Sequence, residues 1–139
     1  MRKISHLAIA LAVSLLAYTY AGFDIKLSIF VLFGALFPDI DTIYKHRIIL
    51  HNIPAMFLAM GVMSWAGVGW NVIMAFALGF VSHLLADSMT EHGTHPFWPF
   101  FSWEMDGPFN TGGFGEKVIV FSVVIIALYF FIRARWLAA

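Results

Sequence analysis

The chain has 139 residues, about the length of one domain, yet 61% of them are hydrophobic and only 12% are charged. A soluble domain has roughly 25% charged residues, so this chain has too little polar surface for a water-facing globule. Eight basic residues balance eight acidic ones and cysteine is absent, which argues against a nucleic-acid partner and excludes disulfides and thiolate metal sites. The composition indicates an integral membrane protein with a single domain over residues 1–139.

Charge-free runs mark the first two expected helices. Residues 4–23 form 20 consecutive positions without Asp, Glu, Lys or Arg, close to the ~20 that cross a bilayer core. A cleaved signal peptide is the alternative for this run, because Arg2 and Lys3 precede it as a basic start. The next apolar run, 27–37, continues directly into Pro38-Asp39-Ile40-Asp41.

The longest charge-free run predicts a helical hairpin. Residues 48–86 are 39 positions without an acidic or basic side chain. As one helix they would reach ~58 Å, nearly two membrane thicknesses. The run must therefore fold back, and Gly67-Val68-Gly69, flanked by two tryptophans, is the expected turn. A last apolar run, 118–132, ends at Arg133.

These runs predict an all-α membrane protein, a bundle of about five transmembrane helices. The expected helices cover about 5–23, 27–42, 53–69, 70–88 and 117–136. The remaining segment, 89–116, is polar and rich in proline, glycine and aromatic residues. This mixture is typical of a loop that packs onto the bilayer surface or over a site.

The few ionisable side chains are sorted by this topology. With five spans, the ends of the second and fourth helices and the starts of the first, third and fifth lie on one side. Eight candidate metal ligands fall at those ends: His6, Asp39, Asp41, His46, His51, His83, Asp87 and Glu116. We therefore expect a metal site at one membrane face.

Energetics favour a metal ion over isolated polar groups. Asp39, Asp41 and Asp87 together would cost ~10 kcal/mol if deep in the membrane and unpaired. His83 and Asp87 are spaced i, i+4, so they share a helix face and could bind one ion. Taken singly, each group could instead be a hydrogen-bonded buried residue or a solvated helix end. Eight ligands exceed the need of one tetrahedral zinc, so two ions fit, with Zn favoured and Mn or Fe as alternatives.

The motifs also resemble a known family. They are Phe37-Pro38-Asp39-Ile40-Asp41, His46-Arg47 followed by His51, Ser82-His83 followed by Asp87, Trp98-Pro99-Phe100, and Thr111-Gly112-Gly113 followed by Glu116. In this combination they resemble the YdjM-like family of LexA-regulated, membrane-bound metal-dependent hydrolases, and the resemblance spans nearly the whole chain. It implies a small membrane-embedded hydrolase.

The site chemistry favours a phosphoester as the substrate bond. Metal ions make hydroxide available near neutral pH, and Arg47 could bind a non-bridging phosphate oxygen in bidentate fashion. Asp41 could orient the attacking water or act as its base. A site at the membrane–water interface suits a membrane lipid or a lipid-linked substrate. The aromatic segment 95–103 could guide the acyl chains or cover the site. His92 and His95 are second-ranked candidates for the same site.

Two other functions use the same residues. A transporter for metal ions or small solutes would use the ligands as a transit site, and a non-catalytic membrane scaffold would keep them without turnover. The chain is expected in the inner membrane. Five basic residues on the ligand side against three on the other favour a cytoplasmic ligand face. The sequence leaves the oligomeric state open.

Overall fold

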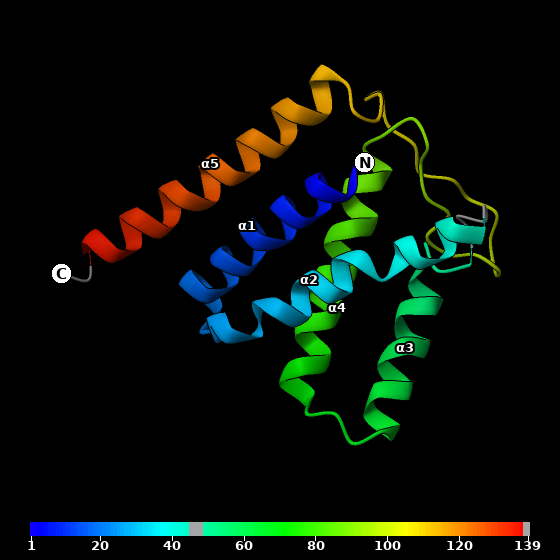
Figure 1. The fold of residues 1–139 in the computed structure, drawn as a ribbon, viewed down its shortest axis with the longest axis horizontal. Coiled ribbons are helices and arrows are strands. Elements are labelled where there is room, and N and C mark those ends of the chain that lie inside the picture. Colours follow the sequence, from blue (N-terminus) through cyan, green and yellow to red (C-terminus); the bar gives the residue numbers. More distant parts are fainter. Residues whose placement is uncertain (45–48, 138–139) are drawn as a thin grey trace.

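The fold consists of helices joined by short turns and one long loop (Figure 1). The computed structural model describes residues 1–44 and 49–137, and within them it has five α-helices and two 3₁₀ helices. In chain order these are α1 (Lys3–Ala21), η1 (Ile25–Leu27), α2 (Ser28–Leu36), η2 (Pro38–Tyr44), α3 (Ile53–Trp65), α4 (Trp70–Ser88) and α5 (Phe114–Leu137). The predicted all-helical fold is confirmed.

Three of the described helices, α1, α4 and α5, are long and apolar enough to cross a bilayer, judged by length and composition. The 19 residues of α1 and of α4 reach ~28 Å and the 24 residues of α5 ~36 Å, against a hydrocarbon core of ~30 Å. α3 is apolar, but its 13 residues reach only ~20 Å, because it ends at Trp65 and not at residue 69.

The second predicted helix, 27–42, is wrong in its extent. α2 covers only nine residues, ~14 Å, and the chain then tightens into η2 at Pro38. Pro38 has no N–H group for the α-helical ladder, and the N–H of Ile40 donates to the carbonyl of Phe37 at 3.2 Å, in the 3₁₀ pattern. Asp39 and Asp41 therefore lie on a tight turn and not at the end of a spanning helix.

Two glycines set the contact between α2 and α4. A Cβ atom on Gly34 would lie 2.0 Å from the carbonyl oxygen of Phe76, and one on Gly79 would lie 1.8 Å from that of Val31. The two backbones therefore touch at positions where only glycine fits, as small residues allow in membrane helix pairs. The contact brings carbonyl groups of α2 beside α4. One of them, the Ala35 carbonyl, contacts His83 in the site described below.

The helix ends gather on one side of the molecule, here named the site end: the starts of α1, α3 and α5 with η2 and the end of α4. Figure 1 shows the start of α1 beside the end of α4, with η2 and the start of α3 on the same side. The Arg2 N–H donates to the Glu116 carboxylate at 3.0 Å and ties α1 to α5. The turn between α1 and η1, which contains Gly22, and the turn between α3 and α4, which contains Gly67, lie away from the site end (Figure 1). Both glycines have positive φ.

The loop between α4 and α5, residues 89–113, is folded back onto the site end. Thr94 and Met105 exchange two backbone hydrogen bonds of 2.8 Å, and the N–H of Ile53 at the start of α3 donates to Pro96 at 2.8 Å. Phe97 stacks on Trp103 with ring centroids 5.9 Å apart. Phe100 and Phe101 of the loop are 73% and 67% exposed, as in segments that lie at a membrane–water interface.

Candidate metal centre

The last turns of α4 supply two buried polar side chains, His83 and Asp87. They lie one helical turn apart, and His83 Nε2 is 3.3 Å from Asp87 Oδ2. Both side chains are almost completely enclosed by protein. The i, i+4 spacing in the sequence thus places an imidazole and a carboxylate on the same face, as predicted.

A backbone carbonyl orients the His83 ring. His83 Nδ1 lies 2.6 Å from the Ala35 carbonyl oxygen of α2. Because a carbonyl can only accept, Nδ1 carries a proton, and in the neutral form of the ring the lone pair of Nε2 points toward Asp87 and its neighbours. Metal-binding histidines are usually fixed in this way through the nitrogen that does not bind the metal. The close α2–α4 contact at Gly34 and Gly79 makes this hydrogen bond possible.

His6 of α1 completes a first group. Its ring stacks on His83 with centroids 3.8 Å apart and planes inclined by 14°. His6 Nε2 lies 3.1 Å from Asp87 Oδ1, the oxygen that also accepts from the Met1 ammonium group. One ligand atom each from His6, His83 and Asp87 lies within 4.8 Å of the other two, so this group could hold a metal ion.

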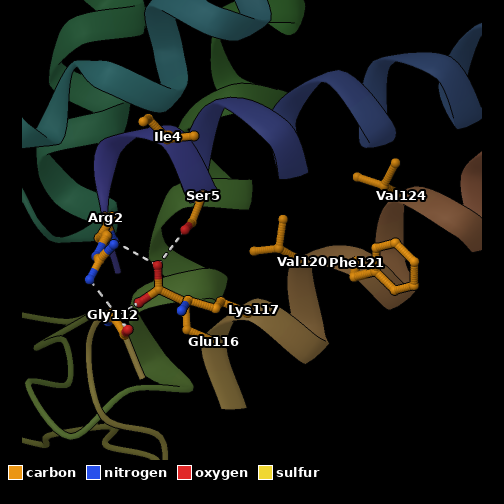
Figure 2. A pocket seen from close by; sticks show the side chains of 9 residues that line it. All are labelled: Arg2, Ile4, Ser5, Gly112, Glu116, Lys117, Val120, Phe121 and Val124. Carbon is orange, nitrogen blue, oxygen red and sulfur yellow. Dashed lines mark hydrogen bonds between the residues drawn. The ribbon is translucent and has the colours of Figure 1, made fainter. Parts of the chain in front are cut away.

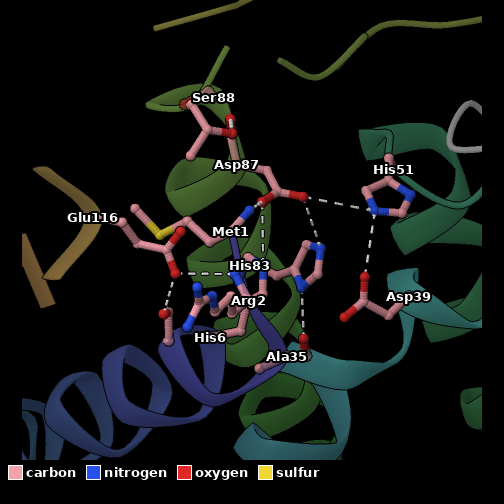
Figure 3. A network of polar contacts seen from close by, with 12 residues as sticks. Met1, Arg2, His6, Ala35, Asp39, His51, His83, Asp87, Ser88 and Glu116 are labelled. Carbon is pink, nitrogen blue, oxygen red and sulfur yellow. Dashed lines mark hydrogen bonds and ion pairs between the residues drawn. The ribbon is translucent and has the colours of Figure 1, made fainter. Parts of the chain in front are cut away.

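His51, just before α3, brings in a second group. Its Nε2 lies 3.8 Å from Asp87 Oδ2 and 4.0 Å from Asp39 Oδ1. Ligand atoms of Asp39, His51 and His83 also lie within 4.8 Å of one another. The two groups therefore share His83, and the two oxygens of Asp87 face different groups. Figure 3 shows the three imidazoles gathered around the Asp87 carboxylate.

The protonation of His51 suits a ligand. Burial lowers the pKa of its imidazole below the usual value, with the cationic form of His83 acting in the same direction and Asp41 opposing it. His51 therefore remains neutral near pH 7 and keeps a lone pair available for a metal.

Asp41 lies behind His51 and not in either ligand group. Its Oδ2 accepts from the Leu50 N–H at 2.8 Å, and its Oδ1 lies 3.1 Å from His51 Nδ1. This is the carboxylate–histidine arrangement that orients a metal ligand from behind. The structure thus gives Asp41 contacts that position His51, whereas the sequence predicted a direct ligand.

Glu116 is likewise outside both described groups. Its Oε1 accepts from the Arg2 N–H and from the Ser5 hydroxyl, and its Oε2 accepts from the Gly112 N–H at 2.6 Å. Both oxygens are thus used to join the start of α1 to the start of α5. Glu116 is one of the most buried carboxylates of the described chain, but its contacts are those of a structural clamp.

The geometry fits a metal ion. The Nε2 atoms of His6, His51 and His83 are all buried, and none makes a hydrogen bond of good geometry among the described residues. Donor atoms bound to one tetrahedral zinc lie about 3.3 Å apart, and the shortest imidazole–carboxylate distances here are 3.1 and 3.3 Å. One divalent cation would satisfy several of these buried atoms at once.

Comparison with known proteins identifies the family of the chain. The family of YdjM inner membrane proteins matches residues 1–138. The chain belongs to this family. Neither the curated proteins nor the solved structures compared with it gave a match. The YdjM family assignment and the apolar helices together make the chain a multi-pass inner membrane protein, as the sequence predicted.

Other predicted site residues of this YdjM protein have different outcomes. His46 and Arg47 lie outside the described residues. His92 is exposed and His95 is half-buried, and neither belongs to a ligand group among residues 1–44 and 49–137. Of the eight predicted ligands, the structure brings together five: His6, Asp39, His51, His83 and Asp87.

Sequence reasoning missed the Ala35 carbonyl, which orients His83. A backbone oxygen carries no side-chain signature, so the available signal was indirect: Gly34 and Gly79 are small residues able to bring two helices together. The start of α3 is capped by Asn52, whose Oδ1 accepts from the Ala55 N–H at 2.8 Å, as its residue type favours at this position.

Proposed function

We propose that this YdjM protein is a membrane-embedded metal-dependent hydrolase that cleaves a lipid-linked phosphoester. The observation that carries the proposal is the convergence of three buried imidazoles on Asp87 at the site end. These side chains come from α1, the turn before α3, and α4. Three imidazoles around one carboxylate form a donor set suited to a divalent metal.

The donor set supports one or two divalent ions, with zinc first and manganese or iron as alternatives. His6, His83 and Asp87 would hold one ion, and Asp39 with His51 would bind a second. The Asp87 carboxylate supports two ions because its Oδ1 faces His6 and its Oδ2 faces His51 and His83. The nitrogen and oxygen donors disfavour soft Cu(I).

The chain's own residues would position water and substrate. A bound divalent metal supplies a water whose pKa is lowered toward ~7. Asp41 Oδ1, 3.1 Å from His51 Nδ1, would hold His51 in place. On the basis of the sequence, its carboxylate is also proposed to accept a proton of the attacking water. Arg47, four residues before His51, is proposed to bind a phosphate oxygen; this assignment depends on the sequence.

The location of the ligands supports a lipid substrate. They lie where three helices of membrane-crossing length begin or end, so a scissile bond beside a headgroup would reach them while its acyl chains stay in the bilayer. The folded loop, which contains the exposed Phe100 and Phe101, lies at the same end (Figure 1). A transit site would need ligands through the membrane depth, and the described groups gather at one end.

The test combines metal content with turnover. Full-length protein in detergent micelles is analysed for bound metal, then assayed with phosphatidic acid, phosphatidylglycerol and a polyprenyl diphosphate for release of a water-soluble product. We expect at least one bound divalent ion, turnover of one of these lipids, and loss of both in Asp87→Ala. His92→Ala, an exposed histidine, is the matched control and should resemble wild type.

The outcomes separate the proposed functions. Asp41→Asn protein that is saturated with metal but inactive supports a hydrolase and excludes a passive scaffold. Folded wild-type protein that contains no metal and is unaffected by a chelator would refute the proposal. Metal-loaded protein that turns over none of the three lipids but transports the ion into vesicles would establish the transporter instead.

A further inference from the structure

A groove runs along the outside of the bundle between α1 and α5, starting at the site end. Its volume is about 380 Å³. One end is polar, with Arg2, Glu116 and Lys117, and the other end is formed by Val120, Phe121 and Val124 (Figure 2). None of the five clustered metal-ligand residues lines it, so the groove is separate from the candidate metal centre.

The polar end is organised around Gly112. This residue has φ +78°, and a Cβ atom on it would lie 2.5 Å from Arg2 Nη2. The guanidinium group therefore lies against the glycine backbone, and its Nη2 donates to the Gly112 carbonyl at 3.3 Å. A side chain at this position would displace the guanidinium group, and the positive φ also favours glycine. The function proposed above gives the Thr111-Gly112-Gly113 motif no role.

The net charge at this end is positive, because the two cations Arg2 and Lys117 lie beside one carboxylate, Glu116. Both Glu116 oxygens already accept from the Arg2 and Gly112 N–H groups and the Ser5 hydroxyl, so the carboxylate is occupied within the protein. The side chains of Arg2 and Lys117 are exposed beside it. Two cations next to a satisfied carboxylate form a site that attracts an anion at the bilayer surface.

The apolar end faces lipid. Val120, Phe121 and Val124 follow one another on a single side of α5, whose most apolar stretch is only 6% buried in the protein. The Phe121 side chain is 67% exposed. A groove with cations at the headgroup end and hydrocarbon toward the membrane centre matches the chemistry of an amphiphile with an anionic head.

We propose that this groove binds one anionic phospholipid from the surrounding bilayer. Its phosphate would contact Arg2 and Lys117, and one acyl chain would lie along Val120, Phe121 and Val124. The lipid is bound as such, with no bond made or broken. The proposal does not depend on hydrolase activity, because the groove lacks the clustered metal ligands.

The experiment measures lipid retention by native mass spectrometry. Full-length protein in detergent is titrated with dioleoyl phosphatidylglycerol or with dioleoyl phosphatidylcholine, which has the same chains but no net charge. We expect one phosphatidylglycerol to bind in preference. Lys117→Gln should weaken its binding about fivefold. Lys117→Arg should restore it, and Val120→Phe, which fills the apolar end, should weaken it at least as much.

Two control variants make the result specific. Arg133→Gln removes a cation at the far end of α5, and Val118→Phe enlarges a side chain that is 45% exposed and does not line the groove. Both should bind the lipid like wild type, with unchanged helical circular dichroism. Equal binding of the two lipids, or equal losses in Lys117→Gln and Arg133→Gln, would overturn the proposal. Loss of the lipid on chelation would place its phosphate at the metal centre and overturn it too.

Discussion

The helices α4 and α5 are both long enough to cross a bilayer, but they are used in opposite ways. α5 has the higher mean hydropathy, 2.2 against 1.4 in the most apolar stretch, yet only 6% of that stretch is buried in the protein against 61% for α4. In a soluble protein the more apolar helix would be expected inside. Here lipid is the solvent, so apolar side chains gain little from leaving it.

The comparison explains where polar chemistry can be placed. α4 is enclosed by α1, α2 and α3 and carries His83 and Asp87 on its last turns. α5 packs mainly on α1, and its buried acidic residue, Glu116, lies in the first turn with its oxygens satisfied by backbone and hydroxyl donors. In a membrane protein, the helix that other helices surround is the one able to hold ligating groups away from lipid.

The largest expected effect is on α4. His83→Ala removes the side chain shared by both ligand groups, so metal affinity should fall more than ~100-fold and purified protein should contain almost no metal. Elemental analysis of protein dialysed against metal-free buffer gives the measurement. His95→Ala is the matched control, because it lies outside both described groups. Equal metal content in the two variants would show that α4 does not hold the ion.

The second prediction concerns the glycine contact that places α4. Gly79→Ala introduces a Cβ atom 1.8 Å from the Val31 carbonyl oxygen, so α2 and α4 must separate, at a cost of about 1–3 kcal/mol in the free energy of unfolding. The separation should also break the bond between His83 and Ala35 and lower metal affinity. Denaturant unfolding in detergent, followed by circular dichroism, measures the first effect.

Gly61→Ala in α3 is the control for this change. Outside its own stretch of α3, no atom of the described residues lies within 4 Å of the position a Cβ would take there, so the variant should be neutral or more stable by up to ~1 kcal/mol through helix propensity. If Gly79→Ala is as stable as Gly61→Ala, the close contact between α2 and α4 does not exist.

A smaller effect is expected from the carboxylate behind the site. Asp41→Asn keeps an oxygen that can accept from the Leu50 N–H but loses the negative charge facing His51 Nδ1. Metal affinity should fall about 10–100-fold, less than for a direct ligand, with little change in fold. Competition with a chromophoric chelator measures the affinity. A loss as complete as that in His83→Ala would make Asp41 a direct ligand.

The sequence predicted the parts of this molecule that depend on local pattern. The spacing of His83 and Asp87 and the turn at Gly67 each follow from one stretch of chain, and the structure has both. The gathering of His6 and His51 near them was predicted from the order of the helices, because topology alone decides which helix ends share a side.

The remaining features depend on distances between residues of different helices, and these distances cannot be read from residue spacing along the chain. Glu116 has the residue type of a ligand and lies at the predicted end of the molecule. Its oxygens accept hydrogen bonds from the backbone N–H groups of Arg2 and Gly112 instead of joining a ligand group. Asp41 is two residues from Asp39, yet in η2 this offset turns the two carboxylates to different sides of His51. The short length of α2 follows from Pro38, which lies inside the predicted range 27–42.

The smallest expected effect tests the comparison between the helices most directly. Ile126 of α5 is 50% exposed, and Ile73 of α4 is 1% exposed. In the membrane, Ile126→Ala exchanges one lipid-facing side chain for a smaller one in folded and unfolded states alike, so the free energy of unfolding should change by less than ~0.5 kcal/mol. Ile73→Ala leaves a cavity between packed helices and should cost about 2–5 kcal/mol. Both variants are measured by denaturant unfolding in the same detergent. Similar losses for the two would mean that α5 is covered by protein in the native assembly, and its low burial would then reflect a missing partner rather than contact with lipid.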